Sequence, residues 1–510
     1  MPLRHKVHLG LVMAAGSLLA LIHSLLRFRN FEAKGYDLGI FDQAVRQYAM
    51  FKAPIVPIKG EDFHLLGDHF HPILVLFAPL YWIWDDPRML NVGMIGLLAS
   101  TAIPVYLVVR GWFSHVPALL SAAALLLWWP FQAIVNWDFH EIAFGVPIIA
   151  WIIWAIERRR MWWAVGLSAV LLAVREDMGV TLFAIALVLA IRRAWLAAAI
   201  TAGLGIFGYW LAVETVIPHF SPAGEFVYWQ YTSLGPSAGA AVLFILTQPW
   251  NAVVVLFDHS LKVSLWLLHF APLLFLPFLS PYVLLGAPIL LSRLFNDRLN
   301  VWSPVYQYDA ILAPIFLLGA MDVIRRLVHQ GVLIPRVPWA RRRTDRSSGD
   351  AVSEAPVGAS GVRGHLPVAI PALLLACGVV GSLLFPQVFP YQRTLTGHNW
   401  SMYERAQAHE RAVKMIPDGV CVEAADTAVP HLVDRTYVGL NGTTAEEDLQ
   451  WLIIDERAAE LGGSHPLTPE EAFQRAERLG FEPVSEDDMG LWVLRRDIPT
   501  AEKCGDYLSR

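Results

Sequence analysis

The sequence predicts an all-α polytopic membrane protein with a small C-terminal α/β domain. Of its 510 residues, 55% are hydrophobic and 16% are charged, whereas a soluble chain carries about 25% charged residues. The apolar residues come in repeated long blocks, and a bilayer core requires about 20 consecutive apolar residues. The 20 Trp and 33 Pro residues fit such a chain, because Trp favours membrane interfaces and Pro is tolerated in membrane helices.

We expect about eleven spans, one for each apolar block. The first block is read as an uncleaved span, because it is long for a signal peptide and no small-x-small cleavage site precedes Arg27. The short blocks flanking 175–177 suggest broken or re-entrant helices that line a cavity. Segments 71–84 and 240–257 are expected to be interfacial helices on the outer surface. The expected spans are residues 7–27, 89–110, 115–135, 142–156, 161–174, 178–191, 194–217, 262–279, 281–295, 308–324 and 366–385.

The arginines predict how the chain is oriented. They occur in alternate loops, and Lys and Arg are enriched in loops that stay in the cytoplasm. This places Met1 inside, and an odd number of spans places the C-terminal domain outside. The expected location is therefore a bacterial cytoplasmic (inner) membrane, with the last domain extracytoplasmic. The loops concerned contain Arg110, Arg158, Arg159, Arg160, Arg192, Arg193, Arg325, Arg326, Arg341, Arg342 and Arg343.

The spans divide the chain into four parts. Residues 1–328 form the multi-span core, 329–365 a flexible cytoplasmic linker with little apolar content, 366–388 the last span, and 389–510 the extracytoplasmic domain. In that domain we expect strands at 420–424, 449–454 and 491–494, and helices at 412–416 and 469–479. Strands that alternate with helices predict a small α/β domain.

The chain contains three cysteines. No CxxC or His/Cys metal spacing is present, so structural zinc is not expected. Cys377 lies in an apolar stretch. Cys421 and Cys504 are the two cysteines of the C-terminal domain, and an oxidising outer compartment would favour a disulfide between them.

Four clusters of ionisable residues fall in the loops on the predicted outer side. A lone acid in such a loop is ordinarily a solvated charge, but ionisable groups at membrane depth are costly and usually functional. The apolar neighbours of the first cluster favour partly buried acids, and the second cluster could bind a divalent cation. The clusters are Asp37 and Asp42; Asp68, His69 and His71; Asp138, His140 and Glu141; and Arg175, Glu176 and Asp177.

For two of these charged positions a purely structural or solvated role is also possible. Arg175 and Glu176 could form a structural pair that joins two half-helices. Asp309, near the outer end of the tenth span, could be no more than a loop charge. Its neighbour Tyr308 is included among the candidate substrate-binding residues.

The combined motifs resemble a family of bacterial predicted membrane proteins, domain of unknown function 2079. The resemblance rests on Gly35-Tyr36-Asp37-Leu38-Gly39-Ile40-Phe41-Asp42-Gln43, Gly67-Asp68-His69-Phe70-His71-Pro72, Phe139-His140-Glu141 and Arg175-Glu176-Asp177. It extends over most of the chain from the first to the tenth span. Two positions depart from the expected pattern: Arg175 stands where Lys is expected, and Gln307 where a His often precedes the Tyr.

That family in turn resembles the C-type fold of glycosyltransferases, which use a polyprenyl-phosphate sugar on the outer face. The resemblance implies that Asp37 is the essential acid of the first outer loop, with Asp42 as a second catalytic candidate. Sugar transfer needs a carboxylate to accept the acceptor's proton and positive charge to stabilise the departing phosphate. Arg175, His69, His71 and His140 are candidates for the phosphate side.

The sequence thus favours a membrane glycosyltransferase that acts on a polyprenyl-phosphate-linked sugar and a cell-envelope glycan or protein acceptor, in contact with membrane lipids. Two alternatives remain open: a transporter or flippase, although no internal repeat of the kind common in transporters is found, and a non-catalytic envelope-assembly protein. The cofactor is left open, with a divalent cation on Asp68, His69 and His71 as one option. Nucleic acid is not an expected partner, because the basic residues form short loop clusters rather than a broad surface.

Overall fold

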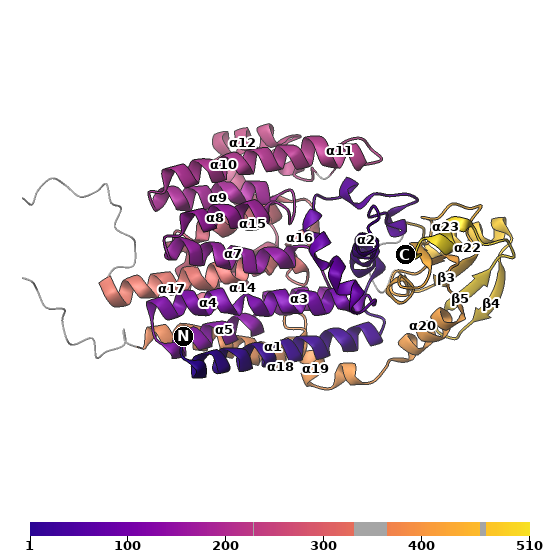
Figure 1. Cartoon of the computed structure of the whole chain (residues 1–510), viewed down its shortest axis with the longest axis horizontal. Helices are drawn as coiled ribbons and strands as arrows, with labels where there is room; N and C mark the ends of the chain where they lie inside the picture. Colours follow the sequence, from indigo (N-terminus) through magenta and orange to yellow (C-terminus); the bar gives the residue numbers. More distant parts are fainter. Residues whose placement is uncertain (228, 331–364, 459–465, 510) are drawn as a thin grey trace, which may run out of the picture.

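The computed structural model describes residues 1–227, 229–330, 365–458 and 466–509. It is elongated, with a helical bundle at one end and a mixed α/β domain at the other (Figure 1). The N-terminus lies at the end of the bundle remote from the α/β domain. Most of the expected linker, residues 331–364, lies outside the described residues.

Each predicted apolar block forms helix in the bundle. The early blocks give α1 (Leu3–Arg29), α3 (Arg88–Ser100), α4 (Ala102–Trp112), α5 (His115–Leu127), α6 (Trp129–Trp137) and α7 (Ile142–Glu157). The later blocks give α8 (Met161–Leu171), α9 (Met178–Ile191), α10 (Trp195–Trp210), α14 (Ser260–Phe270), α15 (Val283–Phe295), α17 (Leu312–Gln330) and α18 (Leu366–Leu384). The all-helical multi-span class that the sequence predicts is confirmed.

The apolar helices differ in whether they are long enough to span a membrane. Five helical stretches of the described chain are long and apolar enough to cross a membrane, and a pair bent by 86°, α13 (Pro249–Val255) with Ser260–Leu273, would make six. The apolar helix α7 has 16 residues, which at about 1.5 Å per residue falls short of a bilayer core of about 30 Å. About eleven spans therefore stays a prediction.

The two segments expected at the outer surface are helical. Residues 72–82 form a 3₁₀ helix, η4 (Pro72–Trp82), and residues 238–255 form α12 (Ala238–Thr247) and α13. Both expose large apolar side chains, such as Leu76 and Leu246 at 61% and 74% exposure. Their interfacial position stays a prediction, and the bend between α13 and α14 offers a broken span as an alternative for the second segment.

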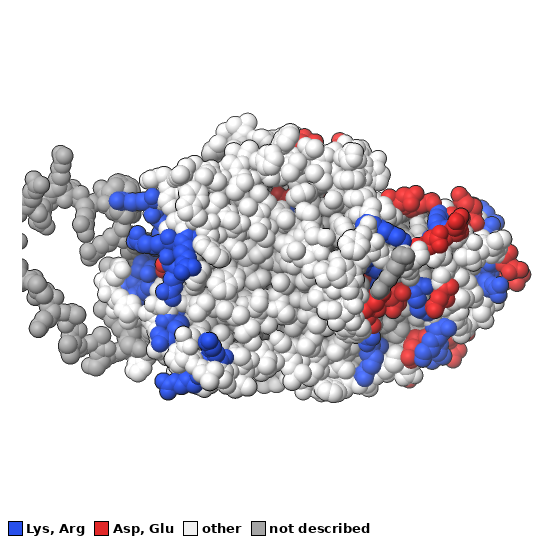
Figure 2. Space-filling view, viewed as in Figure 1, with Lys and Arg blue, Asp and Glu red and all other residues white. Residues whose placement is uncertain are grey.

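Charges are distributed as expected for a membrane protein. Lys and Arg gather at the bundle end that holds the N-terminus, an almost uncharged band follows, and both signs mix on the α/β domain (Figure 2). The arginine-bearing loops meet at the first end, where Glu157 contacts Arg192 and lies 3.5 Å from Arg325. Gly111 approaches Arg158 there, so the loops that the sequence grouped together do share one end.

The α/β domain contains one five-stranded sheet of order β2-β1-β3-β5-β4. Its strands are β1 (Cys421–Ala424), β2 (Tyr437–Leu440), β3 (Trp451–Asp455), β4 (Glu482–Glu486) and β5 (Leu491–Arg495), with helices α20 (Glu404–Met415) and α22 (Pro469–Leu479). β1 pairs in parallel with β2 and β3, whereas β5 pairs antiparallel with β3 and β4. The α/β class is confirmed, but the sequence analysis missed β2 and β4.

The two halves share one hydrophobic core. The buried cluster of the bundle continues into Val429, Leu432, Val433 and Val438 of the α/β domain. The segment after α1 lies between them, and Gln43 of α2 (Ile40–Ala49) donates from its side-chain amide to the Val438 carbonyl at 2.8 Å. The domain is therefore packed on the bundle rather than tethered to it.

Cys421 and Cys504 form a disulfide, as predicted, with a Cα–Cα distance of 5.4 Å. It ties β1 to α23 (Glu502–Asp506) and closes a loop over a sequence separation of 83 residues. A cross-link over such a loop restricts the unfolded chain and typically contributes about 2–4 kcal/mol.

We predict that Cys504→Ser lowers the melting temperature of the protein and makes it insensitive to dithiothreitol, whereas the wild type is destabilised by the reductant. Thermal unfolding in detergent with and without dithiothreitol measures this. Cys377→Ser, which removes the free thiol on α18, serves as the control and should behave as wild type. Equal sensitivity of Cys504→Ser and wild type would show that the disulfide does not form.

Candidate functional site

A cavity of about 410 Å³ lies at the end of the bundle next to the α/β domain. Its walls come from the loop after α1, the loop before η4, the α6–α7 and α8–α9 turns, and the loop between α15 and α17. Among its lining residues are four basic side chains, Lys34, Lys59, Arg175 and Arg298, and three carboxylates, Asp37, Asp68 and Glu141. Ligand pockets typically have about 300–1,000 Å³, so the cavity can hold a small substrate or the head of a larger one.

Asp37 is carried by a single π-helical turn, η1 (Gly35–Gly39). Its Oδ1 lies 3.3 Å from Nε2 of His140, and its side chain is 22% exposed. Burial disfavours a charged His140, but the hydrogen bond to Asp37 and the charges of Asp37 and Glu141 outweigh it and raise the pKa of His140. Asp37 is thus a carboxylate that faces the cavity and is oriented by an imidazole.

The α/β domain fixes the turn that carries Asp37. The Gly35 amide donates to the Asp426 carbonyl and the Tyr36 amide to Asp426 Oδ1, both at 2.8 Å. A Cβ on Gly35 would lie 2.6 Å from Val429, so only glycine permits this approach. Asp426 itself is 1% exposed, and its position therefore sets the position of the turn.

Carboxylates hold the basic groups of the cavity in place. Lys59 donates to Tyr36 Oη at 2.9 Å and to Asp68 at 3.1 Å. Arg175 binds Asp177 through two nitrogens, at 2.8 and 2.5 Å, and lies 3.5 Å from Glu141. Both cations line the cavity, so an anionic group within it would meet preorganised positive charge.

His69 and Glu176 form a further pair across two loops. His69 Nδ1 lies 2.8 Å from Glu176 Oε1, and the Phe70 amide donates to Glu176 Oε2 at 3.1 Å. Burial opposes both charges, but Glu176 and Asp68 raise the pKa of His69 to about 9, and His69 lowers the pKa of Glu176 to about 2. The raised pKa favours the charged form of His69 at the cavity wall, whereas burial lowers the pKa of His71.

The structure brings most of the sequence-derived candidates together. Eight of them line the cavity: Asp37, Asp68, His69, His71, His140, Glu141, Arg175 and Tyr308. Glu176 and Asp177 do not line the cavity, but they pair with two residues that do, His69 and Arg175 respectively. Arg175 and Glu176 thus do not pair chiefly with each other, because each binds a different partner.

Asp42 and Asp138 do not line the cavity. Asp42 is fully buried, 3.1 Å from Arg46 and 2.6 Å from the Tyr81 hydroxyl. These partners hold the Asp42 carboxylate outside the cavity and occupy both of its oxygens. Asp138, with φ 73°, accepts from Arg27 at 3.0 Å and from Asn91 at 2.9 Å, so it connects α1, α3 and the end of α6.

The three candidate metal ligands do not converge. Asp68 is paired with Lys59 and His69 with Glu176. Within the described ranges no group of three or more His, Cys, Asp or Glu side chains has metal-binding geometry. The option of a cation on Asp68, His69 and His71 therefore has no support from the arrangement of these side chains.

The sequence did not point to six polar or aromatic lining residues, Lys34, Lys59, Trp137, Arg298, Asn300 and Tyr306. A lone Lys in an outer loop looks like a solvated charge, so Lys34 and Lys59 gave no signal of their own. Trp137 directly precedes Asp138 and Tyr306 directly precedes Gln307. Their adjacency to motif residues was the signal that could have identified them.

Asp309 is not a loop charge, contrary to the expectation from sequence. It is fully buried, contacts Arg293, and lies 2.7 Å from His269 Nε2. Arg293 also donates to the Val301 carbonyl at 2.7 Å and stacks over Tyr308 at 5.3 Å. The Asp309–Arg293 pair therefore holds the loop whose Arg298, Tyr306 and Tyr308 form one wall of the cavity.

We predict that Asp309→Asn destabilises the protein strongly, by about 3–5 kcal/mol, because it leaves the buried Arg293 guanidinium without its carboxylate. Thermal unfolding in detergent measures the loss. Asp488→Asn, at an exposed position of the α/β domain, is the control and should fall within about 0.5 kcal/mol of wild type. If Asp309→Asn melts at the same temperature as the control, Asp309 contributes no more to stability than an exposed loop charge does.

We predict that Asp426→Ala loosens the turn that carries Asp37, because the Tyr36 amide loses its acceptor. Amide hydrogen exchange of residues 34–39 should become faster, while exchange in α22 is unchanged. Asp426→Asn keeps an oxygen acceptor in place and should restore protection of the turn. Unaltered exchange in Asp426→Ala would show that the α/β domain does not order this turn.

The fold resembles solved glycosyltransferases. ArnT from Cupriavidus metallidurans, in a crystal structure bound to undecaprenyl phosphate, matches with a TM-score of 0.53 and 13% identity over 95% of this chain and 97% of that chain. Archaeoglobus fulgidus oligosaccharyltransferase structures match with TM-scores of 0.41 and 0.39 at 11% identity, each over 96% of this chain and 74% of that chain; these values are too low to add to the argument. The architecture is thus that of the C-type glycosyltransferase fold, as the sequence resemblance implied.

The family assignment is also direct. The model of the family described as "Predicted membrane protein (DUF2079)" matches residues 27–352, and the chain belongs to that family. No curated protein sequence matches this chain. The matched segment ends before the α/β domain, although that domain holds the turn of Asp37.

Proposed function

We propose that the protein is an integral membrane glycosyltransferase that transfers a sugar from a polyprenyl-phosphate donor to a cell-envelope acceptor. The observation that carries this proposal is the single cavity that Asp37 lines together with Lys59, His69 and Arg175. A carboxylate that accepts a proton and cations that bind phosphate are the two requirements of the reaction. Both kinds of group line one cavity at the end of the helical bundle, which supports the proposal.

In the proposed reaction Asp37 takes the proton of the acceptor hydroxyl. The hydroxyl oxygen then bonds to the anomeric carbon of the sugar as the bond from that carbon to the phosphate oxygen breaks. The bonding electrons leave with the phosphate, whose negative charge Arg175, Lys59 and His69 stabilise. The products are the glycosylated acceptor and polyprenyl phosphate, with the proton on Asp37.

The lipid nature of the donor is supported by the position of the cavity and by the fold. The ArnT structure that shares the fold holds undecaprenyl phosphate. In this chain η4 begins next to the lining residue His71 and exposes Val75 and Leu76 at 49% and 61%. An isoprenoid chain lying against that apolar surface would leave its phosphate at the cavity.

The same arrangement disfavours the two alternatives from sequence. Asp37, His69 and His140 line one cavity, and Glu176 binds one of them. A shared site of this kind favours an enzyme over an assembly protein with scattered charged residues. It also lies at the end of the bundle rather than near its middle, where transporters typically bind their substrates.

We predict that Asp37→Asn lowers sugar transfer by about 10²–10⁴, because it removes the proton acceptor while keeping side-chain size. Transfer of label from a polyprenyl-phosphate-linked sugar pool to envelope material, in membranes with matched protein levels, measures this. Asp62→Asn, at an exposed position of the same outer segment, is the control. Full transfer by Asp37→Asn would remove this mechanism.

We further propose that the N-terminus is cytoplasmic and the α/β domain extracytoplasmic, in the cytoplasmic (inner) membrane of a bacterium. The support is the accumulation of Lys and Arg at the N-terminal end of the bundle (Figure 2), together with the disulfide in the other half. Alkaline phosphatase fused after Arg510 should be active in intact cells. If the phosphatase is inactive and a reporter that fluoresces only in the cytoplasm is bright at the same position, the chain has the opposite orientation.

A further inference from the structure

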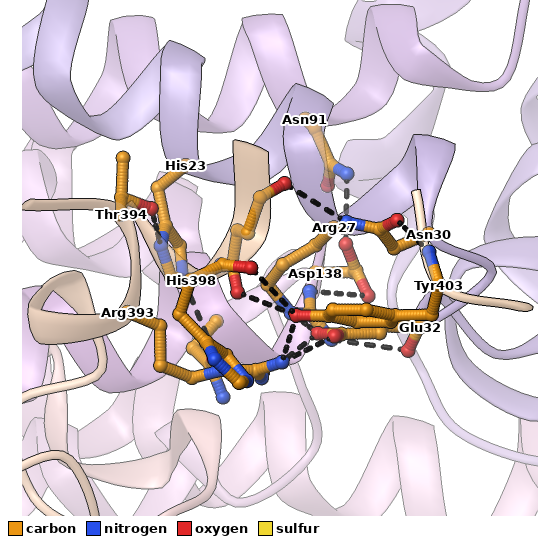
Figure 3. Close-up of polar contacts among 12 residues, drawn as sticks. His23, Arg27, Asn30, Glu32, Asn91, Asp138, Arg393, Thr394, His398 and Tyr403 are labelled. Carbon is orange, nitrogen blue, oxygen red and sulfur yellow. Dashed lines mark hydrogen bonds and ion pairs between the residues drawn. The ribbon is translucent and has the colours of Figure 1, made fainter. Parts of the chain in front are cut away.

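A second cavity, of about 330 Å³, lies between the bundle and the α/β domain. Its walls come from the outer end of α1 and the loop after it, the end of α6, α19 (Tyr391–Leu395) and α20. The residues drawn in Figure 3 include part of these walls, contributed by segments more than 350 residues apart in sequence. The cavity therefore exists only because the α/β domain packs on the bundle.

The second cavity adjoins the first. Lys34 and Trp137 line both cavities, and the Lys34 ammonium lies 4.8 Å from the centroid of the Trp137 ring. Trp137 also contacts Tyr306 of the first cavity, with ring centroids 4.3 Å apart. Lys34 and Trp137 are therefore part of the boundary between the two cavities.

The polar walls are rigid and their charges are largely neutralised. Arg27 lies 3.0 Å from Asp138, and Arg393 binds Glu32 at 2.5 and 3.0 Å (Figure 3). Arg405 contacts Asp455. Because each guanidinium has a carboxylate, the cavity offers fixed N–H donors without the strong excess of positive charge that a phosphate would require.

The remaining lining suits hydroxyl groups and flat apolar faces. Phe31, Trp137 and Tyr403 contribute aromatic rings, and Asn30 and Thr427 contribute side chains that donate and accept hydrogen bonds. Arg405 adds guanidinium N–H groups to the wall, and its Nη2 is held by Asp455.

From these observations we propose that the second cavity binds a neutral saccharide unit. An assignment of that unit to the acceptor of the transfer rests on the proposed function: its hydroxyl would reach Asp37 past Lys34 and Trp137, with the donor sugar in the first cavity. Binding of the saccharide does not depend on transfer. A saccharide combines hydroxyls on all sides with apolar ring faces, which is what these walls complement.

The test is hydrogen exchange of the full-length protein in nanodiscs with single monosaccharides: glucose, N-acetylglucosamine, mannose and arabinose, each at millimolar concentration. At least one should slow exchange in residues 30–34 and at the start of α20, but not in α22. Ala406→Leu narrows the cavity and should abolish the protection. Tyr403→Phe removes the hydroxyl that accepts from Arg393 at 3.1 Å. We expect this variant to need about five times more sugar for half-maximal protection, which corresponds to the loss of about one hydrogen bond.

Gln407→Leu, at an exposed position of the same helix, is the matched control and should keep the protection. Absence of protection by all four sugars, or equal protection in Ala406→Leu, would overturn the proposal. Glucose 1-phosphate is tested in parallel. If it protects these residues and none of the four neutral sugars does, the cavity binds anions and the proposal is wrong. Asp37→Asn should still show the protection by sugar that the wild type shows. If Asp37→Asn also transfers sugar normally, the proposed reaction is wrong, but the saccharide site is still supported.

Discussion

A charged side chain at the edge of a bilayer is stable only when it is paired, because the surroundings solvate it poorly. At the end of the bundle next to the α/β domain the pairs join segments that are distant in sequence: Arg27 with Asp138, His69 with Glu176, and Arg393 with Glu32. Breaking the Arg27–Asp138 or the His69–Glu176 pair would leave a poorly solvated charge. The loops at this end are therefore held in one arrangement, and both cavities depend on it.

The α/β domain belongs to the candidate site as much as the bundle does. It supplies the acceptors for the Gly35 and Tyr36 amides and the far wall of the second cavity. The family match stops at residue 352, yet the turn that carries Asp37 lies against residues after 420. A functional unit defined by the bundle alone would keep His140 beside Asp37 but would lack the Asp426 contacts that hold the turn carrying Asp37.

Much of the fold was predictable because its signals are local. Long apolar blocks, arginine-rich loops and the two cysteines of one domain each have a direct physical reading. The strands β2 and β4 gave weaker signals: β2 has four residues, and β4 contains Glu482, Pro483 and Glu486 on an exposed edge. Neither has the alternating apolar pattern on which recognition of a half-buried strand depends.

The sequence alone determined the membrane class and the positions of the helices, because long apolar blocks are local signals. It suggested the Cys421–Cys504 disulfide but could not establish it, and it could not reveal that Asp42 and Asp309 are buried, because exposure and partners are set by segments far away in the chain. Lys34 and Lys59 became recognisable only once the structure placed them beside Asp37 and Asp68. Tertiary packing decided which charges face the cavity, since in a poorly solvating environment each charge must either find a partner or remain accessible to a ligand.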